Sequence, residues 1–112
     1  MSRDLADEII AIRRALPPAV GMAVRFGDDP AEGLTAAIPE DPAWGIEAQP
    51  VAEGWRISER HRFGGPLPDE HIALAVTSAD EAPGLIADHF RRLQLQVRNA
   101  ACGTPVPRKT QP

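Results

Sequence analysis

Two short runs that alternate apolar residues with small or polar ones lie on either side of a four-residue break in the middle of this chain. Alternation with a period of two is the pattern of a β-strand with one buried face. The apolar members of the two runs are Trp44, Ile46, Ala48, Trp55 and Ile57. An even-numbered loop at Val51–Gly54 pairs Ala48 with Ile57, so that like faces meet. We therefore expect residues 44–63 to form an antiparallel hairpin.

The same register predicts a basic stripe on the polar face of the hairpin. Arg56, Arg60 and Arg62 project from that face, and Gln49 lies opposite Arg56. Glu47 then lies within diagonal reach of Arg56 and Arg60, a favourable cross-strand arrangement. Guanidinium groups in such a stripe can pair with a carboxylate, a phosphate or an acidic protein segment.

Helical periodicity marks both ends of the chain. Ser2 or Asp4 can cap the first helix, and Pro17-Pro18 stops it. Asp80 opens the last helix and Gly103 ends it. The two apolar stripes are Leu5, Ile9, Ile12 and Leu16 in the first helix, and Ile86, Phe90, Leu93 and Val97 in the last.

Three further alternating runs predict the remaining strands. One strand is expected over residues 20–26, a short one over 34–38, and the last over 72–77. The apolar faces of the first and the last of these are Val20, Met22, Val24 and Phe26, and Ile72, Leu74 and Val76.

The expected fold is therefore α+β, with an N-terminal helix, an antiparallel meander of about five strands and a long C-terminal helix on one face. Residues 1–103 form a single domain, and residues 104–112 are expected to be a disordered tail because they lack an apolar period.

Composition narrows the classes of function. The net charge of −4 and the absence of tyrosine argue against a nucleic-acid partner. No apolar run approaches the roughly 20 residues of a membrane helix, and a lone Cys102 cannot form an internal disulfide. A cytoplasmic location is therefore expected. Arginine greatly outnumbers lysine beside abundant alanine, proline and glycine, which indicates a bacterial source with GC-rich coding DNA.

Two surfaces are candidates for binding another protein or a second copy of this chain. The first is the arginine stripe with Glu47. The second is the exposed side of the last helix, where Leu95 lies opposite the core stripe, flanked by Arg91 and Arg98. Interfaces are enriched in arginine, whereas scattered surface leucines need no functional explanation.

An alternative interpretation places a ligand pocket between the sheet and the helices. Glu59 and His61 continue the apolar face of the hairpin and would act there as catalytic or polar groups, since burial can move their pKa values toward neutrality. If instead the strand reaches the rim of the sheet at residue 59, both side chains are solvated. The apolar lining of this pocket would be Met22, Trp44, Trp55 and Phe90.

No motif specifies a metal or a cofactor. His61, Asp69, Glu70 and His71 offer nitrogen and oxygen atoms across a turn, but their spacing matches no known metal site. The sequence favours a small, non-catalytic bacterial protein-binding module of the adaptor, secretion-chaperone or toxin-neutralising immunity type. A small enzyme or ligand-binding domain that uses Glu59 and His61 is the alternative.

Overall fold

The structure, a computed structural model, describes residues 3–62 and 66–101. Gly103 and the tail expected over 104–112 lie outside the described residues. The elements follow one another as α1 (Leu5–Ala15), α2 (Pro18–Gly21), β1 (Val24–Phe26), the short 3-10 turn η1 (Pro30–Glu32), β2 (Leu34–Ala37), β3 (Trp44–Val51), β4 (Gly54–His61), β5 (Glu70–Thr77) and α3 (Ala82–Ala101).

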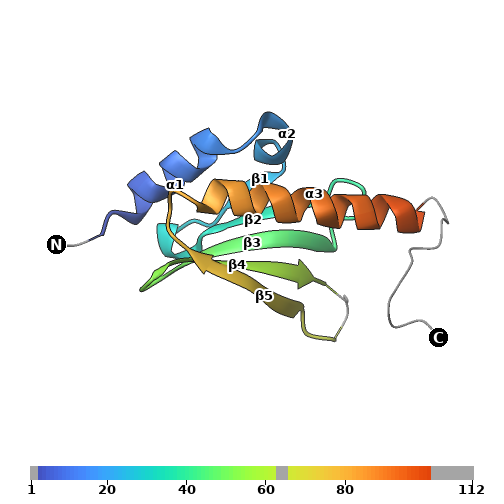
Figure 1. The fold of residues 1–112 in the computed structure, drawn as a ribbon. Helices are drawn as coiled ribbons and strands as arrows, with labels where there is room; N and C mark the ends of the chain where they lie inside the picture. Colours follow the sequence, from blue (N-terminus) through green and yellow to red (C-terminus); the bar gives the residue numbers. More distant parts are fainter. Residues whose placement is uncertain (1–2, 63–65, 102–112) are drawn as a thin grey trace.

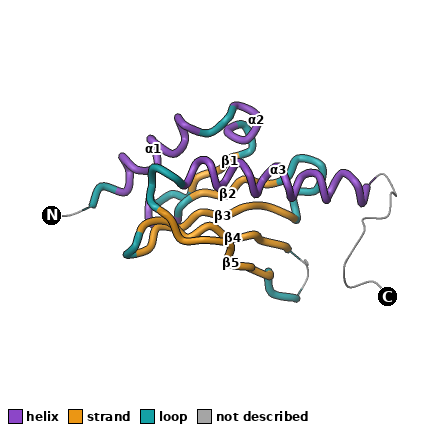
Figure 2. The backbone as a smooth tube through the Cα atoms, viewed as in Figure 1, coloured by secondary structure: helices purple, strands orange, loops and turns teal. Residues whose placement is uncertain are grey.

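The fold is α+β, as the sequence predicts. The five strands form one antiparallel sheet in which each strand pairs with its neighbour in the chain, in the order β1-β2-β3-β4-β5. The helices lie on one side of this sheet, with α3 running roughly along the direction of β2 and β3 (Figures 1 and 2). We name the side that faces the helices the inner face and the opposite side the outer face.

The central hairpin has the predicted register. Ala48 pairs with Ile57 and Gln49 with Arg56, and a two-residue turn joins Val51 to Gly54. Trp55 and Ile57 are fully buried on the inner face, so the buried face fixed the pairing as expected.

Both terminal helices present their predicted stripes to the core. The Asp4 side chain caps α1 by accepting a hydrogen bond from the Asp7 N–H at 3.2 Å. The N–H of Glu81 bonds to the Ser78 hydroxyl at 3.3 Å, so Ser78, rather than Asp80, accepts at the start of the last helical segment. The largest fully buried side chains are Trp55, Phe90, Ile12, Leu34, Ile38, Ile46, Ile57, Ile86 and Val20.

The strand expected over residues 20–26 is wrong in its first half. Pro18 occupies the first position of the short helix α2, where its fixed φ angle suits helical backbone and no N–H is needed. The sheet therefore begins only at Val24, and Met22 follows α2 with 89% of its surface exposed.

The alternation expected along β5 is also interrupted. Pairing with β4 shifts between Ile57 and Ser58, whose partners are Ala75 and Ala73. Leu74 is the extra residue, and such a bulge reverses the faces on either side of it. Val76 pairs with Arg56 and so lies on the outer face, contrary to the expectation that it shares a face with Ile72.

Substitution of Gly54, next to the hairpin turn, is predicted to destabilise the fold. Its φ is +140°, and an added Cβ would lie 2.2 Å from the carbonyl oxygen of Thr77. We expect Gly54→Ala to lower the free energy of unfolding by about 1–3 kcal/mol from backbone strain, with the clash adding to this loss. Gly84→Ala is the matched control. It lies in α3 with nothing within 4 Å of the new Cβ, and it should stabilise the fold by about 0.5–1 kcal/mol. Equal effects of the two substitutions in chemical denaturation would contradict this account.

Candidate functional site

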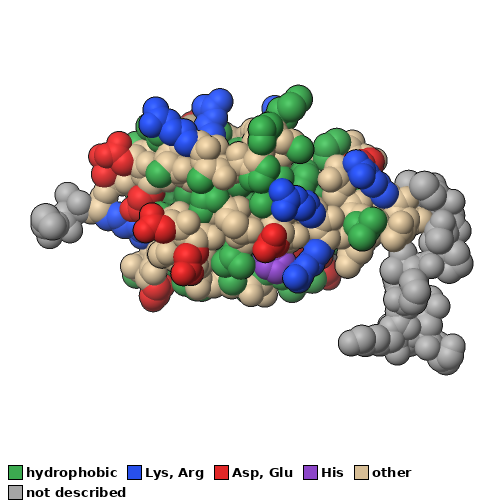
Figure 3. Space-filling model, turned by 45° about the horizontal axis from the view of Figure 1, so that its top comes forward, with side chains coloured by type: hydrophobic (Ala, Val, Ile, Leu, Met, Phe, Trp, Pro, Cys, Tyr) green, Lys and Arg blue, Asp and Glu red, His purple; other side chains and the backbone are tan. Residues whose placement is uncertain are grey.

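The outer face of the sheet has no helix packed on it in the part of the chain that the structure describes. Residues that alternate with the buried ones along each strand point to this face, as the strand register requires. By contrast, the helix-bearing side seen in Figure 3 carries basic, acidic and hydrophobic side chains interspersed with one another. The polar and small residues of the outer face are Arg25, Thr35, Ala37, Gly45, Glu47, Gln49, Arg56, Ser58, Arg60, His71 and Ala73.

Arg60 lies on β4 near the end away from the hairpin turn and is only 7% exposed. It pairs across the strands with Gly45, which has no side chain and so leaves room beside it. Its Nη1 lies 3.3 Å from Oε2 of Glu47. The other oxygen of Glu47 lies 3.1 Å from Nε2 of His71 on β5. The predicted proximity of Glu47 to Arg60 is therefore present, and Glu47 links three adjacent strands.

Two hollows flank the Arg60–Glu47 pair. One, of about 400 Å³, lies toward β1 and β2 and is lined by Arg25, Thr35, Arg60 and Arg62 among others. We name it the Arg60 hollow. The second, of about 320 Å³, lies toward the β3–β4 turn and is lined by residues that include Arg56 and Ser58. The outer face is therefore not flat: it has two hollows, and arginine side chains line both of them.

The remaining predicted partner-binding residues are divided between two sides of the molecule. Arg56 bonds to Gln49 at 2.8 Å on the outer face, and Arg62 lies at its rim, 4.0 Å from Asp69. Arg91, Leu95 and Arg98 belong to α3, on the other side of the sheet. Arg98 forms an ion pair with Glu40, and Leu95 is 59% exposed. The two predicted surfaces therefore remain separate.

Glu59 and His61 lie on β4 at the end away from the hairpin turn. Glu59 pairs with the core residue Ile46, so it occupies the inner face as predicted. The His61 ring stacks on Trp44, with centroids 3.8 Å apart and planes within 8°. Burial raises the pKa of Glu59, Glu70 adds to the shift, and His89 on α3 and His61 oppose it. Glu59 is therefore partly desolvated.

Met22 does not join the other residues of the pocket lining proposed from the sequence. Met22 is exposed, because the chain is helical before it and turns there, and the strand begins only at Val24. Trp55 and Phe90 are within the packed core, 0% and 2% exposed. Trp44 is partly buried and packs against the same core. No group of three or more potential metal ligands exists among residues 3–62 and 66–101.

Titration of Glu59 should lower stability as the pH rises. Because its folded-state pKa is raised, Glu59 contributes stability that is present below the ordinary glutamate pKa and is lost as the pH rises through the folded pKa. The neutral variant Glu59→Gln avoids that loss. The free energy of unfolding of Glu59→Gln minus that of the wild type should therefore increase between about pH 3 and about pH 7. Urea denaturation across that range measures this difference. A difference independent of pH would mean that Glu59 is fully solvated.

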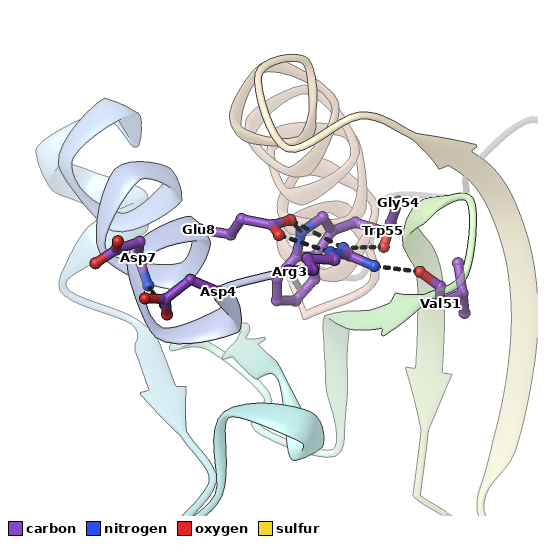
Figure 4. Close-up of polar contacts among 7 residues, drawn as sticks. All are labelled: Arg3, Asp4, Asp7, Glu8, Val51, Gly54 and Trp55. Atoms are coloured by element: carbon purple, nitrogen blue, oxygen red, sulfur yellow. Dashed lines mark hydrogen bonds and ion pairs between the residues drawn. The ribbon is translucent and has the colours of Figure 1, made fainter. Parts of the chain in front are cut away.

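A second polar cluster, which the sequence analysis missed, ties the N-terminus to the hairpin turn (Figure 4). The guanidinium of Arg3 bonds to both carboxylate oxygens of Glu8, at 2.6 and 2.9 Å, and to the carbonyl oxygens of Val51 and Gly54. The buried ring of Trp55 donates its N–H to Glu8 at 2.9 Å. Backbone carbonyls carry no sequence signal, so only the side chains of this cluster could have been recognised in advance.

The Glu8 carboxylate should give the opposite pH dependence to Glu59. Hydrogen bonds from Arg3, and secondarily from Trp55, lower the pKa of Glu8 against the effect of its partial burial. Its stabilising contribution is therefore present above the ordinary glutamate pKa and is lost as the pH falls through the lowered one. We expect Glu8→Gln to be less stable than wild type at neutral pH and to converge with it in acid. A deficit that persists unchanged in acid would contradict the ion-pair assignment.

Comparison with protein-family models, with curated proteins and with solved structures finds no match to this chain. Over the residues described, none of the helices has the length and apolar character needed to span a bilayer.

Proposed function

We propose that this chain is a small, non-catalytic protein-binding module of the bacterial cytoplasm that engages its partner through the outer face of its sheet. The observation that carries the proposal is a five-stranded face with no helix on it in the described part of the chain, presenting Arg25, Arg56 and Arg60 beside two hollows. Small bacterial adaptors, secretion chaperones and toxin-neutralising immunity proteins are the classes that such a module would join.

The size of the face suits a specific interface. Strands lie about 4.8 Å apart and rise about 3.3 Å per residue, so three strands of eight residues and two shorter ones project over about 500 Å². Because side chains project from the sheet, its accessible area is larger than this projected area. The accessible area therefore approaches the roughly 800 Å² that each partner buries in a standard complex. Arginine is also enriched at such interfaces.

Charge supports the choice of this face over α3. The chain carries a net charge of −4, yet the outer face gathers several of its arginines. A basic face on an acidic molecule favours one orientation of approach by a complementary partner. On α3, Arg98 is already paired with Glu40, and Leu95 is exposed.

A second candidate function is a small ligand-binding or catalytic site around Glu59. The raised pKa of its carboxyl, together with His61 and His89 nearby, is the observation that favours this alternative. A desolvated carboxyl can act as a general acid or base near neutral pH. The two hollows at the Arg60–Glu47 pair, however, lie on the opposite face of the sheet from Glu59.

Photo-cross-linking in the cells that make this protein tests which surface binds. The photoreactive residue p-benzoylphenylalanine would replace Gln49 or Ala73 on the outer face, and Arg92 on α3 as the matched exposed control. We expect a discrete cross-linked protein from the two outer-face positions and none from residue 92. A cross-linked product of twice the chain mass would identify a second copy as the partner. Cross-links only from residue 92, or from no position, would contradict the proposal.

A further inference from the structure

The Arg60 hollow contains a guanidinium whose hydrogen bonds are incomplete. Nη1 of Arg60 bonds to Glu47, but the buried Nε has no hydrogen-bond partner among the described residues, and Nη2 makes no hydrogen bond to them. Leaving a buried donor unsatisfied is unfavourable, and native proteins rarely do so without a reason. The N–H groups of Nε and Nη2 form one edge of the planar guanidinium and point in parallel.

Resting on the proposed function, we propose that the Arg60 hollow binds the carboxylate of an aspartate or glutamate side chain in an acidic segment of the partner protein. Nη2 is the accessible member of that edge, because the Nε atom itself is buried, and guanidinium N–H groups form strong charge-assisted hydrogen bonds to carboxylates. Glu47 holds the guanidinium by its other side, and the absence of a side chain at Gly45 leaves the strand below it bare.

The charges around the hollow favour one added negative group. Arg25 forms no ion pair with another described residue, and Arg62 lies 4.0 Å from its nearest carboxylate, that of Asp69. The acidic groups at the hollow already have partners. Glu32 accepts the backbone N–H of Asp29 at 3.0 Å within a capping box, and Glu47 accepts from Arg60. Three guanidinium groups therefore face three carboxylates, those of Glu32, Glu47 and Asp69, and Arg25 alone of the three arginines forms no ion pair with a described residue.

The same charges disfavour a phosphate group as the occupant. The carboxylates around the hollow equal its guanidinium groups in number, so a dianionic phosphate would leave the site with two excess negative charges, whereas a carboxylate adds only one. A nucleic acid would also need a basic stripe that follows its backbone, whereas this chain is acidic overall. An acidic protein segment needs only one side chain to enter the hollow while its neighbours contact Arg56 or Arg62.

Fluorescence anisotropy with the full chain tests this directly. The probe is a labelled glycine-serine peptide containing a run of glutamates, compared with the same peptide in which glutamine replaces each glutamate. We expect the glutamate peptide to bind at least about tenfold more tightly, and salt to weaken it. Arg25→Gln combined with Arg62→Gln removes two exposed arginines that line the hollow, and should reduce the affinity about tenfold or more.

Two further variants keep the test specific. Arg91→Gln combined with Arg92→Gln removes equal charge from exposed positions of α3 and should leave the affinity within about twofold of wild type. Arg60→Lys retains the charge but loses the parallel N–H edge, and should weaken binding wherever thermal melting shows that it is folded. If Arg60→Lys is not folded, the affinity of the Arg25/Arg62 double variant alone tests whether the hollow binds the glutamate peptide.

Three results would overturn the inference. The first is equal binding of the glutamate and glutamine peptides, and the second is equal loss in the α3 control and the hollow variants. The third is displacement of the peptide by a single-stranded DNA oligomer at lower concentration than by unlabelled glutamate peptide, which would assign the hollow to phosphates. Each of these leaves the cross-linking from residues 49 and 73 intact, so failure of the carboxylate site is distinguishable from failure of the interface itself.

Discussion

The antiparallel pairing of β3 with β4 determines which side chains enter the core and which ones form the outer face. Its register puts Trp55 and Ile57 under the helices, and the pleat then obliges Arg56 and Arg60 to face the other way. Since a shift of one residue would exchange the two faces, the burial of Trp55 against the core also fixes where the guanidinium groups point. The stability of the hydrophobic core and the chemistry of the outer face are therefore consequences of one register.

Arg60 on the outer face is buried even though no described helix covers it. Arg60 is 7% exposed although it lies near the end of β4 that is away from the hairpin turn. A buried charge requires a partner, and Glu47 supplies one at 3.3 Å. Glu47 also contacts His71 on β5, so this one carboxylate connects groups on three adjacent strands. That arrangement makes the face a fixed shape on which a partner could dock with little reorganisation.

The elements that the sequence predicted well are those in which one periodic pattern had no competitor. The hairpin had a strict alternation and an even loop, and the stripe of α3 ended in a buried Val97. The run from Val20 to Phe26 satisfied the strand pattern too, but Pro18 favoured a helical turn first, and a local backbone preference prevailed over the alternation. The bulge at Leu74 had no glycine or turn residue to announce it, so the outward position of Val76 could not be foreseen.

Sequence reasoning was weaker for the site, because polar residues on a strand are ordinarily taken as solvated. It placed Arg60 near Glu47 but did not predict that Arg60 is buried. That burial depends on Gly45, which pairs with Arg60, and on strands that lie far along the chain. It missed the Arg3 cluster because two of its acceptors are backbone carbonyls, 48 and 51 residues away. Long-range contacts of this kind depend on the finished fold rather than on local pattern.

Arg3 and Arg60 show how differently one fold can use the same side chain. Both hold the β3–β4 hairpin, Arg3 at its turn and Arg60 near its opposite end. Arg3 donates to Glu8, Val51 and Gly54, so its guanidinium is satisfied by intramolecular bonds. Arg60 is the more buried of the two and makes fewer bonds, although burial raises the cost of every unsatisfied donor. A purely structural role would favour the reverse distribution, which is why the free edge of Arg60 points to a bound acceptor from outside the chain.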